Sequence, residues 1–307
     1  MLEHHPGGLS TETDSGPLPE RPLLAPWLRR AESADGALLL EYADEIVAVD
    51  GDASVLKLLD GTRTLGELDP VERSAVAVLA SEGVVVPGPA VADAEALREA
   101  ALGRLAPSLV ARRLATARIA LAGTSPVAEE LARLLPGSVR RTGWDEPVDA
   151  ELAVAAPDPR ELPELAGWNE RSLDAGLTWL LTLPFNGRLA CIGPLFVPGE
   201  TCCYRCFVRR RASALPDPAD MLALERTPAT YPLGRSIAAT LAGLAAAAAA
   251  RWLGRRDGSI AGAFFALELD DGPSVTRHRV LRVPRCEACS PARGEPPLLP
   301  WASGIRR

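Results

Sequence analysis

The segment Arg118-Ile-Ala-Leu-Ala-Gly-Thr-Ser-Pro-Val-Ala-Glu-Glu-Leu-Ala-Arg-Leu-Leu135 combines an apolar strand, a glycine turn and a helical pattern. The apolar run up to Gly123 predicts a buried strand, and the apolar residues of 127–135 recur on one side of a helix. A strand that meets a helix across a glycine turn is typical of nucleotide-binding α/β sheets, where a phosphate lies at the helix N-terminus. The segment therefore predicts an α/β sheet domain that begins at residue 118.

The phosphate site expected at this turn is incomplete. Ser125 and Ala128 stand where the glycine fingerprint needs its second and third glycines, and Pro126 removes a backbone N–H. Lys57 is the only lysine of the chain, so this domain has no lysine that could hold a phosphate. We expect a nucleotide-type fold that does not bind nucleotide.

Strands and helices alternate along the rest of this domain. Two strands meet across Asn186-Gly187, a dipeptide typical of tight hairpins, and an alanine-rich helix follows at 236–253. The other expected elements are a strand at 151–155, a helix at 162–175 and strands at 177–183, 188–192, 263–269 and 275–283. This order predicts a mostly parallel sheet with an antiparallel extension over 118–292, followed by an extended tail at 293–307.

Four of the six cysteines form two Cys-x-x-Cys pairs, Cys203 with Cys206 and Cys286 with Cys289, separated by 79 residues. One turn delivers both thiolates of such a pair to a tetrahedral ion, and four thiolates leave no open coordination position. The predicted ion is therefore a structural Zn(II). The alternatives are that one pair is redox-active or that the cysteines are ordinary buried residues.

The residues around the first pair leave two further questions. Cys202 competes with Cys203 as a ligand, although the spacing favours Cys203, and Cys191 lies inside a predicted strand as a small core residue. Arg205 and the arginines at 209–211 form a basic cluster. That cluster is either a surface for an anionic partner or a solvated helix face.

Composition restricts the class of protein. The chain has 307 residues, 47% hydrophobic residues and a net charge of −7, which favours two globular domains and disfavours a protein that coats nucleic acid. No apolar run is long enough to predict a membrane span, and the N-terminus lacks the pattern of a secretory signal. We expect a cytoplasmic protein with reduced cysteines that contacts neither membrane nor nucleic acid.

The N-terminal third predicts a second, smaller domain. Strands are expected at 37–42 and 45–49, with an earlier one near 26–30, and helices at 53–59, from Thr64 and at 71–81. Three strands followed by three helices predict a winged-helix-like domain at 24–88. A disordered tail is expected at 1–23 and a helical connector at 89–117.

Both domains resemble one known family. The segment from Gly193 to Cys206, followed by Arg-Cys-Glu-Ala-Cys at 285–289, resembles the ThiF-like, ubiquitin-activating-enzyme-like proteins of azol(in)e and thiopeptide biosynthesis. The stretch 53–68, with its Leu-Leu-Asp-Gly turn, is similar to the PqqD-like recognition element that binds leader peptides. Together the two resemblances cover about residues 24 to 290.

The resemblance implies a scaffold rather than an enzyme. The leader of a ribosomally made precursor would add beside the strand at 45–49 and against the helix at 71–81, and a partner YcaO-type cyclodehydratase would use ATP to form azolines. A homodimer is a further partner that the family suggests. The residues implied in leader binding are Glu45, Ile46, Val47, Ala48, Val49, Arg73, Val76, Leu79 and Ala80.

Three other interpretations stay open. An adenylyltransferase of the ThiF type would need the phosphate site that the sequence lacks. A winged-helix DNA regulator conflicts with residues 24–88, where five basic residues face twelve acidic ones. The edge strand at 45–49 could also be covered by the N-terminal segment of the same chain.

Overall fold

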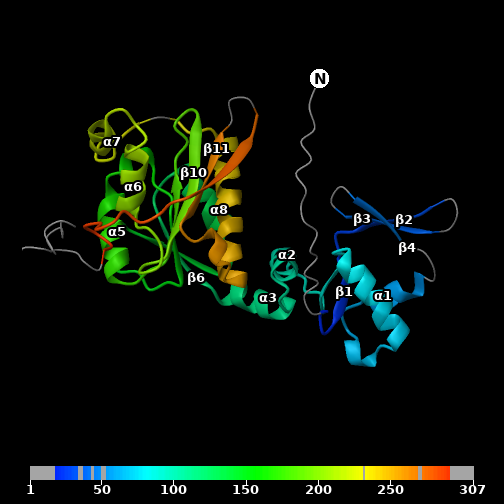
Figure 1. The fold of residues 1–307 in the computed structure, drawn as a ribbon. Coiled ribbons are helices and arrows are strands. Elements are labelled where there is room, and N and C mark those ends of the chain that lie inside the picture. Colours follow the sequence, from blue (N-terminus) through cyan, green and yellow to red (C-terminus); the bar gives the residue numbers. More distant parts are fainter. Residues whose placement is uncertain are drawn as a thin grey trace, which may run out of the picture. The chain divides into compact units, whose positions relative to one another are not determined.

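The chain divides into two compact units, Met1–Arg112 and Arg113–Arg307 (Figure 1). The computed structural model describes residues 18–33, 37–42, 45–49, 53–230, 232–268 and 272–290. Most of the predicted tail at 1–23 and all of the tail at 293–307 therefore lie outside the described residues.

The first unit contains two small sheets and a helical segment. An antiparallel sheet has the order β2-β3-β4, and β1 pairs with β5 in a separate ladder. Its strands are β1 (Pro22–Leu24), β2 (Arg29–Glu32), β3 (Leu38–Tyr42), β4 (Glu45–Val49) and β5 (Val85–Pro87). Its helices are the 3-10 turns η1 (Ala53–Leu58) and η2 (Leu65–Glu67), α1 (Pro70–Ser81) and α2 (Ala94–Gly103), with α3 (Pro107–Thr116) at the boundary between the units.

Local chemistry explains where α1 begins. The Asp69 carboxylate accepts hydrogen bonds from the N–H groups of Val71 and Glu72 at 2.8 Å each, and the Glu72 carboxylate accepts one from the Asp69 N–H. Pro70 occupies the first helical turn, where its missing N–H costs no helical bond. Leu40 of β3 belongs to the same buried cluster as Val76 and Leu79 of α1, which gives this unit a core of its own.

Two details of the first unit correct the sequence-based expectation. Residues 22 and 23, assigned to the disordered tail, belong to β1, which forms by pairing with β5, a strand about 60 residues further along the chain. The helix expected at 53–59 is the 3-10 turn η1. The winged-helix assignment itself stays a prediction.

The second unit is built on a seven-stranded sheet with the order β12-β11-β10-β9-β8-β6-β7. Strands β7, β6, β8 and β9 are parallel, and β10, β11 and β12 extend them in antiparallel pairing, as predicted. The strands are β6 (Arg118–Ala122), β7 (Ser138–Thr142), β8 (Leu152–Ala155), β9 (Trp179–Leu183), β10 (Leu189–Phe196), β11 (Ala263–Glu268) and β12 (Ser274–Arg279). The hairpin between β9 and β10 turns at the expected Asn186-Gly187.

Helices cover both faces of this sheet (Figure 1). Helix α8 packs against α4, and α6 packs between α5 and α7. The helices are α4 (Pro126–Leu134), α5 (Glu164–Asp174), α6 (Tyr204–Ala212), α7 (Pro218–Leu224) and α8 (Arg235–Arg255), with the 3-10 turns η3 (Pro159–Glu161) and η4 (Gly258–Ile260). Strand β7 was not predicted, because it has a single apolar residue, Val139, and lies at the sheet edge.

Helix α8 is longer than the sequence pattern suggested. Its 21 residues are long and apolar enough to cross a membrane, and half of its most apolar window is buried inside the unit. Ala238, Leu241, Ala245 and Ala249 follow helical spacing on its buried side. This pattern is that of a core helix.

Candidate functional site

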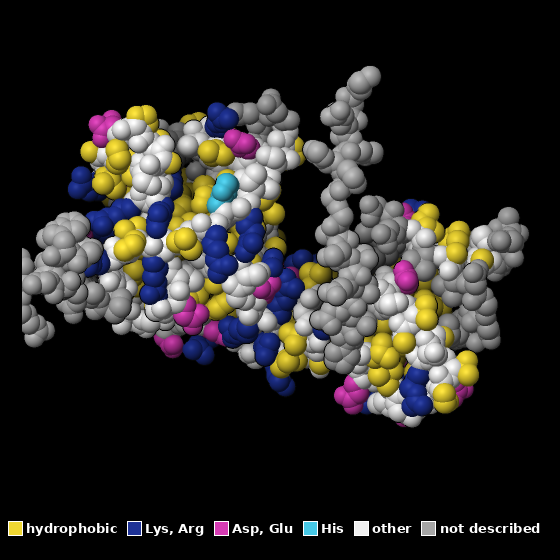
Figure 2. Space-filling model, viewed as in Figure 1, with side chains coloured by type: hydrophobic (Ala, Val, Ile, Leu, Met, Phe, Trp, Pro, Cys, Tyr) yellow, Lys and Arg dark blue, Asp and Glu magenta, His cyan; other side chains and the backbone are white. Residues whose placement is uncertain are grey.

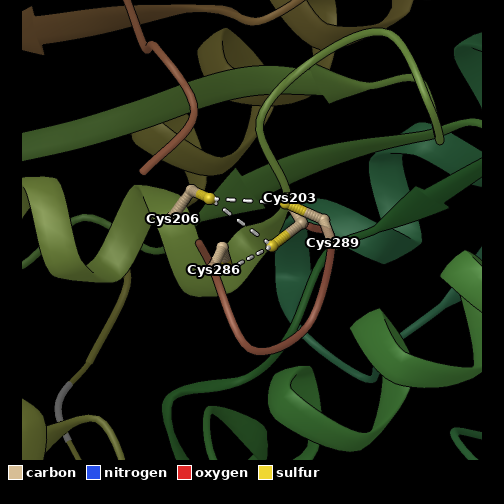
Figure 3. A group of neighbouring side chains, drawn as sticks. All are labelled: Cys203, Cys206, Cys286 and Cys289. Carbon is tan, nitrogen blue, oxygen red and sulfur yellow. Dashed lines mark hydrogen bonds between the residues drawn. The ribbon is translucent and has the colours of Figure 1, made fainter. Parts of the chain in front are cut away.

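Four cysteine sulfurs converge where α6 begins and where the chain turns after β12 (Figure 3). Cys203 precedes the first turn of α6, Cys206 lies within that turn, and Cys286 and Cys289 lie in the later turn. The Sγ atoms of Cys203 and Cys206 are 3.8 Å apart, those of Cys203 and Cys286 3.8 Å, and those of Cys206 and Cys289 3.6 Å. The four predicted ligands therefore form one cluster.

The sulfur geometry fits a tetrahedral ion. A zinc ion with four Zn–S bonds of about 2.3 Å would place its sulfurs about 3.8 Å from one another. All four Sγ atoms lie within 4.8 Å of one another. The cluster is thus compatible with a structural zinc, which Cys203, Cys206, Cys286 and Cys289 would hold with no open position.

Hydrogen bonds to the sulfurs change the pKa values of the cysteines that would bind an ion as thiolates. The Val283 N–H donates to the Cys206 Sγ at 3.3 Å. A hydrogen bond from Cys203 and this backbone donor lower the pKa of Cys206 to about 4, and the same shared proton raises the pKa of Cys203. Burial raises the pKa of Cys289 to about 11. Cys203, Cys206 and Cys289 therefore differ in how readily they lose a proton, and a bound cation would favour the thiolate form of its ligands.

Neighbouring polar groups fix the two pairs to each other. The Asn169 Oδ1 accepts the Tyr204 N–H at 2.8 Å, which ties α5 to the first turn of α6. Glu287, inside the second pair, forms 2.7 Å ion pairs with both Arg205 and Arg209 of α6. The salt bridges join the segments that carry the two Cys-x-x-Cys pairs.

These contacts revise the interpretation of the basic cluster. Arg205 and Arg209 form ion pairs with Glu287, and Arg211 forms one with Glu225 at 2.9 Å. Arg210 alone of the four meets no carboxylate among the described residues, and it donates to the backbone oxygens of Leu281 and Arg282. Three of the four arginines thus pair with carboxylates of their own unit, and the cluster mainly links the segments that carry the four cysteines rather than forming a free surface for an anionic partner.

The two remaining cysteines lie outside the four-sulfur group. Cys202 is buried beside it, and burial raises the pKa of Cys202 to about 12. Cys191 is half-buried on β10, and burial also raises its pKa. Both thiols are held in the neutral form.

The turn that could cradle a phosphate is occupied by groups of the protein. Gly123 has φ +108°, and a Cβ placed on it would lie 2.1 Å from the Ala156 carbonyl oxygen. Ser125 caps α4 through the Ala128 N–H at 3.1 Å, and its hydroxyl donates to the Ala156 oxygen at 2.8 Å. Gly123 therefore permits close approach of β8, and Ser125 uses a helix donor that a phosphate would need.

A glutamate carboxylate occupies the anion position at this turn. The Glu161 side chain accepts hydrogen bonds from the N–H groups of Thr124 at 2.9 Å and Asp158 at 2.7 Å. The Trp144 Nε1 donates to its other oxygen at 3.2 Å. Sequence reasoning missed Glu161, although Asp158 and Glu161 have the three-residue spacing of a capping box.

In the first unit, β4 lies at the edge of its sheet. Among the described residues it pairs with β3 alone. The Ile46 side chain is 68% exposed, and Ala48 is also exposed. For Glu45, Val47 and Val49 the structure describes the backbone of the strand. An extended peptide could hydrogen-bond to the outer side of β4.

The predicted contributions of α1 to a peptide site are corrected in part. Val76 and Leu79 are fully buried in the core of the first unit, so they cannot line a surface pocket. Arg73 is exposed. Ala80 is half-buried and lines a cavity of about 400 Å³ with Trp27, Val85 and Leu102.

The exposed large apolar residues of α1 are Val71 and Val78, which sequence reasoning did not select. Helical periodicity identifies an apolar face but does not say what that face contacts. Here Val76 and Leu79, the residues predicted to contact a ligand, pack into the core instead. Val71, Val78 and Arg73 are therefore among the exposed side chains of α1 that a peptide could contact.

Solved structures share the fold of this chain. The heterocyclase TruD matches with a TM-score of 0.63 at 24% identity, covering 88% of this chain and 43% of that chain. The microcin C7 biosynthetic enzyme MccB, in complex with N-formylated MccA, matches with a TM-score of 0.58 at 15% identity, covering 88% and 99%. MccB of E. coli with ATP matches with a TM-score of 0.57 at 16% identity, again covering 88% and 99%.

The chain spans less than half the length of the heterocyclase and nearly all of MccB. No protein-family model matches the sequence, and no curated protein matches it. At these identities the similarity shows a shared fold that includes both units.

Proposed function

We propose that this chain is a non-catalytic accessory subunit in the biosynthesis of ribosomally made, azoline-containing peptides. Its first unit, a PqqD-like recognition element, binds the leader of a precursor peptide. Its second unit, a ThiF-like platform with a structural zinc, presents that precursor to a YcaO-type cyclodehydratase in the cytoplasm. The cyclodehydratase, not this chain, uses ATP.

The observation that carries the peptide-binding part is the exposed edge of β4. Ile46 and Ala48 are exposed on a strand that has one described neighbour, β3. Main-chain groups at such an edge give affinity to an added strand, and neighbouring side chains select its sequence. The similarity to TruD and to MccB bound to N-formylated MccA supports the same assignment.

The Glu161 contacts support the absence of catalysis. A nucleotide phosphate would have to displace a carboxylate that already holds the Thr124 and Asp158 N–H groups and the Trp144 indole. Ser125 and Pro126 further reduce the number of donors at the start of α4. A second anion at this place would meet the charge of Glu161.

Fluorescence anisotropy with the labelled leader of the precursor encoded beside this gene tests the proposal. We expect micromolar or tighter binding, and Ile46→Pro should weaken it about tenfold or more because a ladder N–H is lost. Ile46→Val keeps that N–H and serves as the matched control. Equal affinities of the proline and valine variants would refute the site assignment.

The second candidate is a ThiF-type adenylyltransferase. The similarity to MccB solved with ATP favours it, and the occupied turn at Glu161 disfavours it. We expect no ATP–pyrophosphate exchange by the chain in the presence of leader or full precursor. Exchange above the background of a protein-free sample would establish the adenylyltransferase instead.

A further inference from the structure

The second unit has its own exposed strand at the end of its sheet. Strand β12 pairs with β11 in an unbroken six-residue register, from Ala263 opposite Arg279 to Glu268 opposite Ser274. Among the described residues β12 has no partner on its other side, and all six of its residues are exposed. It contains no proline and no bulge, two of the devices that commonly close a sheet edge.

The register determines which backbone groups point outward. The Val280 N–H donates to the Gly262 oxygen at 2.8 Å, which places that pair among the hydrogen-bonded positions of the ladder. Hydrogen-bonded and non-hydrogen-bonded pairs alternate along antiparallel strands. Thr276 and His278 therefore direct their backbone groups at β11, and Val275, Arg277 and Arg279 direct theirs to the open edge.

Three arginines on or beside β12 make no ion pair among the described residues. Arg277 donates to the Ser259 backbone oxygen, and Arg210 donates to the oxygens of Leu281 and Arg282 just after the strand. Within the described ranges, Arg210, Arg277 and Arg279 form no ion pair with an acidic side chain. The face of the second unit drawn in Figure 2 carries many basic side chains with few acidic ones among them.

The opposite edge of the same sheet differs. On β7, Arg141 pairs with Glu129 at 2.7 Å and donates to the Gly123 oxygen at 3.0 Å. Arg140 donates to the Pro147 oxygen at 3.3 Å. One of the two arginines of β7 is thus neutralised by a carboxylate of its own unit, whereas Arg277 and Arg279 of β12 are not.

We propose that β12 binds an acidic, extended segment of a partner protein as an eighth strand of this sheet. Arg277 and Arg279 are two residues apart and share one face of β12, so carboxylates at alternate positions of the added strand would meet both. The outward backbone groups of Val275, Arg277 and Arg279 would form the new ladder.

Two other occupants fit less well. A second copy of the chain paired through β12 would bring Arg277 and Arg279 against their own equivalents, and like charges across strands are destabilising. A nucleic acid would satisfy the arginines and leave the outward N–H and C=O groups without strand partners. An acidic polypeptide satisfies both. This site is separate from β4 and does not depend on the proposed function.

Fluorescence anisotropy tests the proposal. The probe is a labelled peptide of alternating Glu and Val, eight residues long by design so that it spans β12, and it is titrated with the full zinc-loaded chain. There are three reference probes. One is a peptide of the same composition with its Glu residues in one block and its Val residues in another, the second is a peptide of alternating Lys and Val, and the third is a DNA duplex. We expect the alternating acidic peptide to bind best and to weaken as salt rises.

Arg277→Glu combined with Arg279→Glu should weaken that binding about tenfold, because two attractive pairs become repulsive. Val275→Pro should weaken it without a change of charge, by removing an outward N–H. Arg140→Glu on β7 and Ile46→Pro on β4 are the controls, and both should leave the affinity unchanged. Circular dichroism and zinc content would verify that each variant is folded.

The proposal is overturned if the double arginine variant binds the peptide as well as the original chain does. Equal binding of the alternating and block peptides would show plain charge attraction and would also refute strand addition. Tighter binding of the DNA duplex, lost in the same arginine variant, would assign the edge to nucleic acid. Loss of binding in Ile46→Pro alone would place the peptide on β4 instead.

Discussion

Single residues decide whether this nucleotide-type sheet retains a nucleotide site. The Ala156 carbonyl leaves no room for a side chain at Gly123, so the close packing of the chain explains this glycine without a phosphate. Glu161 supplies from within the chain the negative charge that a phosphate would bring. A glycine after a first strand is therefore weak support for phosphate binding, and the anion position beside it is the more informative place to inspect.

Removing the Glu161 carboxylate should destabilise the second unit. In Glu161→Ala the N–H groups of Thr124 and Asp158 and the Trp144 indole lose their acceptor, which should cost about 2 kcal/mol of unfolding free energy. Urea denaturation measures the change. Glu164→Ala, at an exposed neighbouring position, should change stability by less than about 0.5 kcal/mol. Similar losses for both variants would contradict the structural role of Glu161.

The four-cysteine centre predicts one zinc per chain. Cys206→Ser should abolish tight zinc binding and cost several kcal/mol of stability, because structural zinc contributes directly to folding. Cys191→Ser, the same change outside the cluster, should keep the metal. Elemental analysis of freshly purified protein gives the stoichiometry. Zinc retained in full by the Cys206 variant would rule out the assigned ligand set.

At the residue scale, sequence spacing identified all four sulfurs because Cys-x-x-Cys brings its ligands together within one turn. It did not identify Glu161 or Glu287, whose partners lie far along the chain or on another element. It misassigned Val76 and Leu79, since an apolar helical face is the same pattern whether it meets a core or a ligand.

Elements with strong local signals were predicted well, and elements that depend on distant partners were not. The strand β6, the hairpin of β9 with β10 and the helix α8 follow from apolar runs, a tight-turn dipeptide and alanine content. Strand β1 has three residues and β7 has a single apolar residue, and each depends on a strand elsewhere in the chain for its hydrogen bonds. Periodicity measures the side-chain pattern and does not report on pairing.

The C-terminal end of α8 carries a pH-sensitive contact. Burial alone would raise the pKa of Asp257, but hydrogen bonds from Ser259 and Arg251 outweigh it and lower the pKa to about 2. A carboxyl whose pKa is lower in the folded state stabilises the fold above its unfolded value near 4 and loses that contribution as the pH falls toward 2.

Asp257→Asn should therefore lower the unfolding free energy by about 2 kcal/mol at pH 7, and the difference should shrink below pH 4. Denaturant titrations at several pH values follow this. Asp145→Asn is a suitable control, because its ion pair with Arg171 lies largely in solvent and should contribute little. A deficit that persists unchanged at pH 3 would contradict the assignment.

The whole molecule consists of two units with separate cores. Leu40, Val76 and Leu79 belong to the core of the first unit, whereas the cysteine cluster packs with Trp168, Trp179 and other aromatic residues of the second. Sequence analysis predicts two domains from composition and motif order, since each has its own apolar pattern. It could not place their boundary within the helical connector, where the structure divides the chain after Arg112.

Zinc removal should affect the two units unequally. After chelation under reducing conditions we expect amide protection to fall across residues 118–290 and to persist across the strands and α1 of the first unit. Leader affinity should remain within about threefold, because the proposed leader site lies in the first unit. Hydrogen-exchange mass spectrometry measures the protection. Parallel loss in both units would mean that they fold as one.

The four-cysteine cluster joins parts of the chain that are far apart along the backbone. Cys203 and Cys206 precede α7 and α8, and Cys286 and Cys289 follow them, while β10 and β11 on either side share one ladder. A protease that nicks the exposed segment around 213–220 would therefore cut the polypeptide without releasing either piece. A zinc ion held by the four cysteines would link the two fragments in addition to the β10–β11 ladder, so their separation would require denaturing conditions as well as removal of the metal.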